Sequence, residues 1–292
     1  MTSQEKRHLI LNNGDRIGII GCSNGIRSEA RWQLEQLQGI LMQMGLVPVL
    51  SPYLFREGYE TSTERQRAEA LMDCYRDKRV TAIFDISGGD LANGVLDYLD
   101  YERIQNNPKP MFGYSDLTTV LNAIYQKTGQ KGYLYQLRNL VSDNGIMQHM
   151  RFSNSLFQGK LDLYQIHWHW IQNISMEGIV VGGNLRCLLK LAGTEYFPNM
   201  KDKLLFLESR SGNIEFIASC FTQLKQMGVF KQIKGLLLGT FSQLDEQWGS
   251  FMAEKIALQV LNDRLLPVAR TMEVGHGTDS KCLIIGEYYK IR

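Results

Sequence analysis

Apolar segments of strand length alternate with helical patterns along most of this 292-residue chain. Segments such as Arg16–Gly21, Thr81–Ser87 and Leu204–Glu208 are almost continuously apolar, which is typical of strands that are buried on both faces of a sheet. Residues with helical periodicity fill the spaces between these segments. The alternation predicts an α/β fold with mainly parallel strands covered by helices, and functional residues are expected at the carboxyl ends of the strands.

A serine occupies one such strand end. Residues 109–112 predict the end of a buried strand, and the apolar residues from Leu117 to Ile124 recur at the spacing of one helical face. Ser115 therefore lies on the turn, where the N–H groups of the helix N-terminus can stabilise a developing negative charge. This is the arrangement of a nucleophile elbow, although the second glycine of the usual motif is absent. A helix-capping role for Ser115 stays open at this point.

A carboxylate and a histidine far along the chain could complete a catalytic set with Ser115. Glu208 ends a strand of four apolar residues, and His276 lies between Gly275 and Gly277 in a late loop. A nucleophilic serine needs a base within hydrogen-bond distance, and the base needs a carboxylate that orients it. Taken singly, Glu208 could form a strand-end ion pair and His276 could be an ordinary loop residue. Their convergence is a hypothesis about the fold.

Composition excludes several classes of protein. The net charge is +2 and the sequence contains no long run of Lys or Arg, so nucleic acid is not an expected partner. The longest apolar runs are too short to span a membrane, and the polar N-terminus does not resemble a signal peptide. The five scattered cysteines form no C-x-x-C pair, which predicts reduced thiols and a cytoplasmic location.

Three local patterns suggest ligands only weakly. Gly18, Gly21 and Gly25 do not have the G-x-G-x-x-G spacing of a dinucleotide site, and the helix expected after them covers residues 26–44. The alternating segment 164–171 predicts a strand, on which the two histidines would share one face and the two tryptophans the other. A third metal ligand is missing nearby, so we expect no metal site. The candidate ligands and stacking groups of this segment are His167, His169, Trp168 and Trp170.

Several motifs together resemble the LD-carboxypeptidase family of serine peptidases, which includes muramoyltetrapeptide carboxypeptidases and microcin C immunity proteins. The resemblance covers nearly the whole chain, and the G-Y-S-D-x-T block is its most specific part. Many members have R-G-G-Y-G where this chain has Ser87-Gly-Gly-Asp-Leu, which is closer to the immunity branch, yet the region 130–178 is short for that branch. The motifs are Ser87-Gly-Gly, Asp100-Tyr-Glu-Arg-Ile-Gln-Asn-Asn-Pro-Lys, Gly113-Tyr-Ser-Asp-Leu-Thr, Gly182-Gly-Asn-Leu, Gly193-Thr-Glu-Tyr, Leu205-Phe-Leu-Glu and Gly275-His-Gly-Thr.

The resemblance implies a flavodoxin-like parallel-sheet domain, expected over residues 1–165, and a smaller α/β domain with β-barrel character over residues 166–292. It further implies a homodimer, and no cofactor is expected. The expected site residues are Ser115, Glu208 and His276 as a catalytic triad, the backbone N–H groups of Gly89 and Asp116 as an oxyanion hole, and Gly88 and Asn184 as substrate-binding positions.

The expected activity is hydrolysis of the amide before a terminal D-amino acid in cytoplasmic muropeptides. One alternative is an immunity-type peptidase that cleaves a peptidyl- or aminoacyl-nucleotide amide, with Trp168 or Trp170 stacking on the nucleobase. A second alternative is a non-catalytic protein that binds muropeptides. The sequence does not identify the residue that recognises the carboxylate of the substrate.

Overall fold

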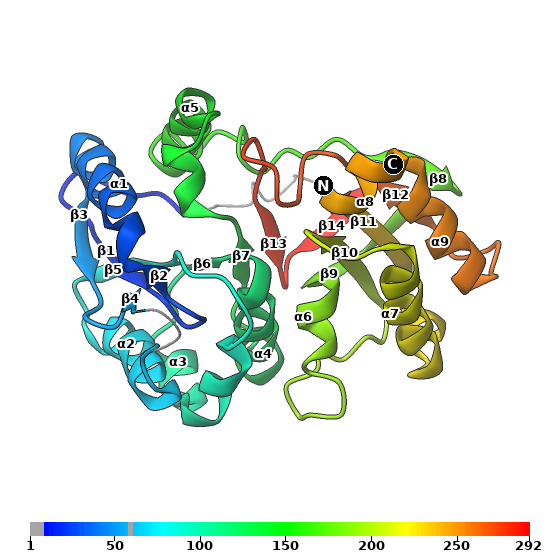
Figure 1. The fold of residues 1–292 in the computed structure, drawn as a ribbon, viewed down its shortest axis with the longest axis horizontal. Helices are drawn as coiled ribbons and strands as arrows, with labels where there is room; N and C mark the ends of the chain where they lie inside the picture. Colours follow the sequence, from blue (N-terminus) through cyan, green and yellow to red (C-terminus); the bar gives the residue numbers. More distant parts are fainter. Residues whose placement is uncertain (1–8, 58–60) are drawn as a thin grey trace, which may run out of the picture.

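Two six-stranded sheets lie side by side in the computed structural model, which describes residues 9–57 and 61–292 (Figure 1). Each sheet has a mainly parallel centre, because the connections between its inner strands are helical crossovers. The mixed α/β class predicted from the sequence is confirmed.

The first sheet has the strand order β13-β7-β6-β5-β1-β3. Its five parallel strands, counted along the chain, follow the order 2-1-3-4-5 of flavodoxin-like folds, and β13 is antiparallel to β7. This confirms the predicted flavodoxin-like architecture. The strands are β1 (Arg16–Ile20), β3 (Val47–Leu50), β5 (Val80–Asp85), β6 (Met111–Gly113), β7 (Gly132–Leu134) and β13 (Leu283–Ile285).

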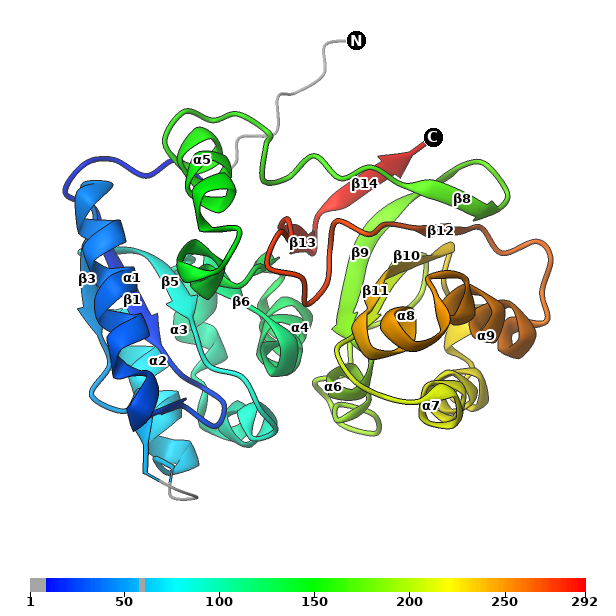
Figure 2. The same cartoon turned by 45° about the horizontal axis from the view of Figure 1, so that its top comes forward.

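Helices cover both faces of the first sheet (Figure 2). Leu37 of α1 and Phe152 of α5 belong to the apolar cluster on one face, whereas Leu71 of α2, Ile104 of α3 and Leu121 of α4 belong to the cluster on the other. Burial on both faces explains why these strands lack an alternating pattern. The helices are α1 (Arg31–Gln43), α2 (Glu64–Arg76), α3 (Tyr101–Asn106), α4 (Thr118–Thr128) and α5 (Gly145–Leu156).

The second sheet has the order β14-β9-β10-β11-β12-β8, with four parallel central strands and an antiparallel strand at each edge. It is curled but open, so its barrel character is that of a half-barrel (Figure 2). The strands are β9 (Met176–Asn184), β10 (Lys203–Ser209), β11 (Gly235–Phe241), β12 (Val268–Arg270), β8 (His169–Gln172) and β14 (Tyr288–Ile291), and the helices are α6 (Leu185–Leu189), α7 (Ile214–Gln226), α8 (Ser242–Trp248) and α9 (Phe251–Leu261).

The two sheets share one apolar core. Val180 of β9, Phe206 of β10 and Leu237 of β11 belong to the same buried cluster as Leu121 of α4, which lies between the sheets. The opposite face of the second sheet is covered by α6, α7, α8 and α9. After β12 the chain returns to the first sheet as β13 and then to the second as β14. The segment between β12 and β13, which carries His276, therefore crosses from one sheet to the other.

Two local predictions differ from the structure. The helix expected from residue 26 begins at Arg31, because Ile26 and Arg27 form the short strand β2 that pairs with β4 (Phe55–Arg56). The strand expected over 164–171 is confined to β8, because residues 161–165 form a turn with hydrogen bonds to the carbonyl of Leu161. Hydrophobic periodicity predicts neither feature, because the first depends on pairing between segments that are distant in the sequence and the second on a local turn.

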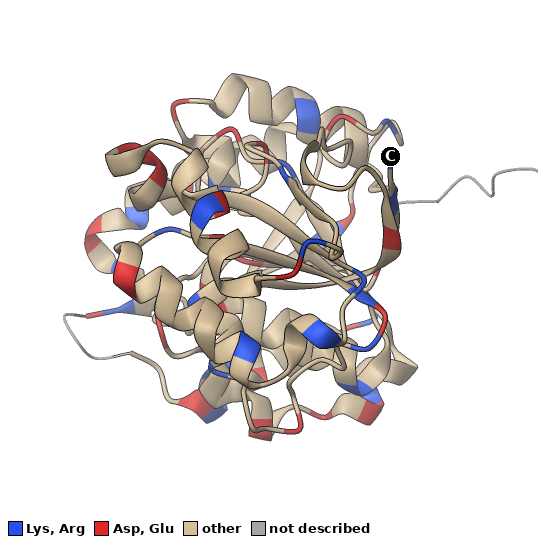
Figure 3. Ribbon diagram, turned by 90° about the vertical axis from the view of Figure 1, so that its right-hand side faces the viewer, with Lys and Arg blue, Asp and Glu red and all other residues tan. Residues whose placement is uncertain are grey.

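Acidic and basic residues are scattered over the helices and loops, with both signs intermixed (Figure 3). The even mixture agrees with the small net charge of +2. None of the helices in residues 9–57 and 61–292 is long and apolar enough to cross a membrane.

Candidate active site

Ser115 occupies a strained turn at the carboxyl end of β6. Its φ angle is +56°, in the left-handed region that a non-glycine residue rarely adopts. Gly113 allows the turn to close, since a Cβ there would lie 2.7 Å from the Cβ of Leu117. Ser115 caps neither the 3-10 helix that it begins nor α4, so its hydroxyl is not used as a helix cap. The strain and the position agree with a nucleophile elbow.

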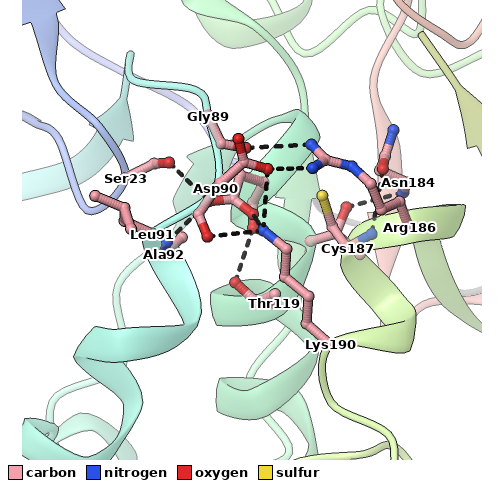
Figure 4. Close-up of polar contacts among 12 residues, drawn as sticks. Ser23, Gly89, Asp90, Leu91, Ala92, Thr119, Asn184, Arg186, Cys187 and Lys190 are labelled. Atoms are coloured by element: carbon pink, nitrogen blue, oxygen red, sulfur yellow. Dashed lines mark hydrogen bonds and ion pairs between the residues drawn. The ribbon is translucent and has the colours of Figure 1, made fainter. Parts of the chain in front are cut away.

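The side chain of Asp116 anchors this turn and is completely buried. Its Oδ2 accepts hydrogen bonds from the hydroxyl of Ser23 at 2.7 Å and from the N–H of Ala92 at 2.8 Å. Its Oδ1 accepts one from Lys190 Nζ at 2.5 Å (Figure 4). Since the carboxylate is fully engaged in these contacts, Asp116 can act on a substrate only through its backbone N–H.

The loop after β5, which carries Gly89 and Asp90, is held by residues of α6 from the second half of the molecule. Arg186 donates to the carboxylate of Asp90 and lies 3.5 Å from the carbonyl of Gly89, and Lys190 Nζ donates to the carbonyl of Asp90 at 2.9 Å (Figure 4). Both basic residues lie on α6 or immediately after it. Arg186 and Lys190 therefore fix the loop after β5 to the second half of the molecule, and Lys190 also fixes the turn at Ser115 through Asp116.

Gly89 itself has a φ angle of +135°, and a Cβ there would clash with the side chain of Asn24. The amide oxygen of Asn24 accepts a hydrogen bond from the N–H of Asp90 at 2.7 Å, which fixes the loop from its other side. No acceptor among the described residues meets the N–H of Gly89 or of Asp116. Both groups are thus available as hydrogen-bond donors near Ser115.

Glu208 and His276 form a hydrogen-bonded pair. Nδ1 of His276 lies 2.7 Å from Oε2 of Glu208, whose side chain is wholly buried. The other carboxylate oxygen accepts a hydrogen bond from the amide of Asn184 at 2.9 Å. Because an ionised carboxylate can only accept, this contact places a proton on Nδ1, and in the neutral imidazole Nε2 then has the lone pair. This is the tautomer that a general base requires.

The ring of His276 packs edge-on against Tyr114, with 4.8 Å between the ring centroids. Burial raises the pKa of the Tyr114 hydroxyl well above its usual value, and the nearby negative charge of Glu208 adds to this shift. The phenol therefore stays neutral beside the carboxylate.

Gly275 allows the loop that carries His276 to approach β11, since a Cβ at this position would clash with the side chain of Thr240.

Ser115 and His276 line a single pocket of about 670 Å³ at the carboxyl edge of the first sheet. Nε2 of His276 is buried, and no hydrogen-bond partner for it is found in the described part of the chain. The structure therefore contains the link from His276 to Glu208 but no hydrogen bond from Ser115 to His276. Such bonds often tighten only when substrate binds.

The predicted site residues fall into two groups. Ser115, His276, Gly88 and Gly89 line the pocket, and Glu208 lies directly behind His276. Asn184 is buried outside the pocket lining, where it caps α6 and holds Glu208. The remaining lining residues, which sequence reasoning did not select, include Tyr114, Arg27, Arg56, Arg138 and Arg210.

The histidines and tryptophans of the 164–171 segment have structural contacts. Nδ1 of His167 lies 3.2 Å from Glu273, and Nε2 of His169 lies 3.5 Å from Glu254. Trp168 packs edge-on against Phe206, and both Trp168 and Trp170 are partly buried against the shared core. In the part of the chain that the structure describes, no three potential ligands are grouped as a metal would require.

The family descriptions that match this sequence are the LD-carboxypeptidase N-terminal domain, over residues 17–136, and the LD-carboxypeptidase C-terminal domain, over residues 177–291. A putative carboxypeptidase of Treponema pallidum (strain Nichols) is 28% identical over 312 residues, covering 98% of this chain and 92% of that protein. The microcin C7 self-immunity protein MccF of Escherichia coli is 28% identical, covering 75% and 73%. The probable murein peptide carboxypeptidase of Bacillus subtilis (strain 168) is 27% identical, covering 94% and 88%.

Solved structures share the same fold. MccF in complex with aspartyl sulfamoyl adenosine has a TM-score of 0.87 and 24% identity, covering 98% of this chain and 95% of that one. The muramoyltetrapeptide carboxypeptidase of Oxalobacter formigenes has a TM-score of 0.75 and 20% identity, covering 94% of each chain. At these identities the likeness shows the fold alone.

Proposed function

Because this chain belongs to the LD-carboxypeptidase family of serine peptidases, we propose that it removes the terminal D-amino acid from muropeptides. The proposed role is recycling of murein fragments in the cytoplasm. The observation that carries the proposal is the convergence of Ser115, His276 and Glu208, which come from three distant segments, at one pocket.

In the proposed mechanism, Nε2 of His276 takes the proton from the hydroxyl of Ser115, whose oxygen attacks the scissile carbonyl carbon. The resulting tetrahedral intermediate collapses as the imidazolium donates its proton to the leaving amine. Water then attacks the acyl-enzyme with His276 again as the base, releasing the shortened peptide and the free serine. Glu208 holds the tautomer of His276 and stabilises its positive charge.

The oxyanion hole is assigned to the backbone N–H groups of Gly89 and Asp116. Both lie next to pocket-lining atoms, and neither meets an acceptor among the residues described. One such donor typically lowers the activation barrier by about 3–4 kcal/mol. The contacts of Arg186 and Lys190 with the two loops would keep both donors fixed while the negative charge develops.

An immunity-type peptidase is the second candidate, favoured by the similarity to MccF, whose structures include a complex with aspartyl sulfamoyl adenosine. Its substrate would be the amide of a peptidyl- or aminoacyl-nucleotide. Tyr114 is the one aromatic residue that lines the pocket within the described part of the chain, and it is occupied by its contact with His276. Because no other Phe, Tyr or Trp among the described residues lines the pocket to stack on a base, we rank the muropeptide first. The third candidate is a muropeptide-binding protein without turnover.

A direct comparison of substrates tests these candidates. The protein would be incubated with a tetrapeptide muropeptide and, separately, with a processed microcin, and the products identified by mass spectrometry. We expect loss of the terminal D-alanine from the muropeptide, and no loss with Ser115→Ala. Cleavage of the microcin alone would establish the second candidate. Tight binding of the muropeptide without turnover of either compound would establish the third.

The family resemblance also leads us to propose a homodimer, which sedimentation velocity would test. All five cysteines are buried and unpaired by disulfides, which supports a reducing compartment.

A further inference from the structure

Four arginines line the pocket, and no Asp or Glu of the described residues lines it. No carboxylate among the described residues lies within ion-pair distance of any of them, whereas the buried side chains of Asp116, Glu208 and Arg270 each have a charged partner or histidine. Arg56 and Arg138 are half-buried, and unpaired charges in such positions are costly unless an anion binds them. The lining therefore fits a substrate with more than one negative charge. The four residues are Arg27, Arg56, Arg138 and Arg210.

The arginines form two pairs. Arg27 and Arg56 are directly opposite each other in the parallel pairing of β2 with β4, which places them on neighbouring strands about 4.8 Å apart. Nε of Arg56 is buried and has no partner in the residues described. We refer to these two residues as the distal pair.

Arg138 and Arg210 form the second pair, which we call the proximal pair. Arg138 follows β7, and Arg210 follows β10 in the second sheet. Burial lowers the pKa of Arg138; the buried Asp85 opposes this shift, and the like charge of Arg210 adds to it. Because both side chains line the same pocket, their two guanidinium groups can bind one anion together. Nε of Arg138 and the amide nitrogen of Asn139 are both buried without a hydrogen-bond partner among the residues described.

The strand order places these pairs on opposite sides of Ser115. Ser115 follows β6, Arg138 follows the adjacent strand β7, and Arg27 follows β1, which lies two strands away on the other side. The ends of β7 and β1 lie about 4.8 Å and about 10 Å from β6, which are the lengths of about one and of two to three residues of extended peptide. A terminal carboxylate lies one residue beyond the amide that a carboxypeptidase cleaves.

We propose that the proximal pair binds the terminal carboxylate of the leaving amino acid and that the distal pair binds a second carboxylate on the acyl side of the substrate. The inference rests on the proposed function. It assigns the substrate to the class of acidic peptides with a carboxylate two or three residues before the cleaved bond. The α-carboxylate of a γ-linked D-glutamate in a muropeptide has this chemistry.

Matched peptides and variants test the assignment. The reference peptide is L-Ala-γ-D-Glu-meso-diaminopimelate-D-Ala. One analogue has a C-terminal amide, and the other has γ-D-Gln in place of γ-D-Glu, so each lacks one carboxylate. The variants are Arg138→Gln and Arg27→Gln, and Arg264→Gln, an exposed residue outside the pocket, is the control.

For Arg138→Gln we expect kcat/KM on the reference peptide to fall about 10- to 100-fold, as a charge-assisted hydrogen bond predicts, with less than about a threefold change on the C-terminal amide. For Arg27→Gln the same loss should appear on the reference peptide and vanish on the γ-D-Gln analogue. Arg264→Gln should match the parent protein on all three. Equal losses on a peptide and on the analogue without the matching carboxylate would overturn the assignment.

Failure of the proposed function would have a different signature. Binding of the three peptides to Ser115→Ala protein, measured by calorimetry, examines the arginine pairs without turnover. If the parent protein cleaves none of the peptides and a fluorophosphonate does not label Ser115, the proposed hydrolase is wrong. The arginine pairs would still be supported by two results together. Removing either carboxylate should weaken peptide binding at least tenfold, and the matching Arg→Gln substitution should cause no further loss of affinity for the peptide that lacks that carboxylate. Equal binding of all three peptides, or tighter binding of aspartyl sulfamoyl adenosine, would overturn the inference.

Discussion

The two halves of the candidate active site are held in different ways. On the nucleophile side, Ser115 has a strained φ angle, and the neighbouring Asp116 is fixed by three hydrogen bonds, one of them from the other half of the molecule. On the base side, His276 has one hydrogen bond to Glu208 and an edge-on contact with Tyr114. The nucleophile turn is therefore over-determined, whereas the imidazole is held at one nitrogen.

The difference follows from what each side must do. A backbone conformation that costs free energy persists only where surrounding contacts enforce it, and the contacts of Asp116 do so. In the proposed mechanism His276 accepts and returns a proton at Nε2, which meets no hydrogen-bond partner among the described residues. Wholly buried Glu208 provides charge stabilisation without restricting that nitrogen. We therefore expect substitutions on the base side to change chemistry, and substitutions in the anchor of the nucleophile turn to change both stability and chemistry.

The largest effect should come from removing either end of the proton-transfer pair. Ser115→Ala and His276→Ala should each lower kcat by about 10⁵- to 10⁶-fold, because the two residues act as one unit. The double variant should be no worse than either single variant, measured by D-alanine release. Additive losses would mean that the two side chains act independently, which would contradict a shared site.

The next largest effect should come from Glu208→Gln, with a fall in kcat of about 10⁴-fold, since the amide favours the wrong tautomer of His276. The exposed Glu246, changed to Gln, is the matched control and should leave kcat unchanged. Steady-state kinetics on the tetrapeptide would measure both. A loss of less than tenfold in Glu208→Gln protein would show that His276 does not depend on this carboxylate.

A smaller effect is expected at the anchor of the nucleophile turn. Lys190→Met leaves the buried carboxylate of Asp116 without its cation, so the free energy of unfolding should fall by about 1–3 kcal/mol. We expect kcat to fall about tenfold, because the Asp116 and Gly89 donors would lose part of their support. Lys127→Met removes an exposed ion pair with Glu195 and should change unfolding by less than about 0.5 kcal/mol.

Urea denaturation and kinetics on the same samples would separate these contributions. Equal stability changes in Lys190→Met and Lys127→Met would contradict the anchoring role. An unchanged kcat in Lys190→Met would show that the nucleophile turn keeps its geometry without the contact.

The last expected effect is measured as a change in stability. Gly275→Ala places a Cβ against Thr240 and should cost about 1–3 kcal/mol by overpacking. Gly39→Ala, inside α1 with open space around it, should instead stabilise the protein by up to about 1 kcal/mol. Thermal unfolding of the two variants would measure the difference. Equal unfolding temperatures of the two variants would mean that the His276 loop is not positioned by its close approach to β11.

Much of the fold followed from local sequence. Continuous apolar strands and helical periodicity predicted the α/β class, and the helical face from Leu117 to Ile124 lies mainly in α4. Ser115, Glu208 and His276 could be selected because each follows or neighbours a recognisable local feature. The division of the chain into domains 1–165 and 166–292 stays a prediction.

The other contributors to the site depend on long-range pairing that no local pattern encodes. Arg27 lies beside Arg56 only because β2 pairs with β4, where a helix was expected. Lys190 reaches Asp116 only because α6 packs beside α4. The return of the chain to the first sheet at β13, which brings the His276 loop across, is also a tertiary event. Arginines and lysines at loop positions are too common to be selected without that geometry.

Labelling with a fluorophosphonate, followed by peptide mass spectrometry, tests most directly whether the three residues form one catalytic unit. The account predicts an adduct on Ser115 in the parent protein that forms at least about 100-fold more slowly in His276→Ala and Glu208→Gln. An adduct on another residue, or equal labelling of Ser115 in all three proteins, would contradict it.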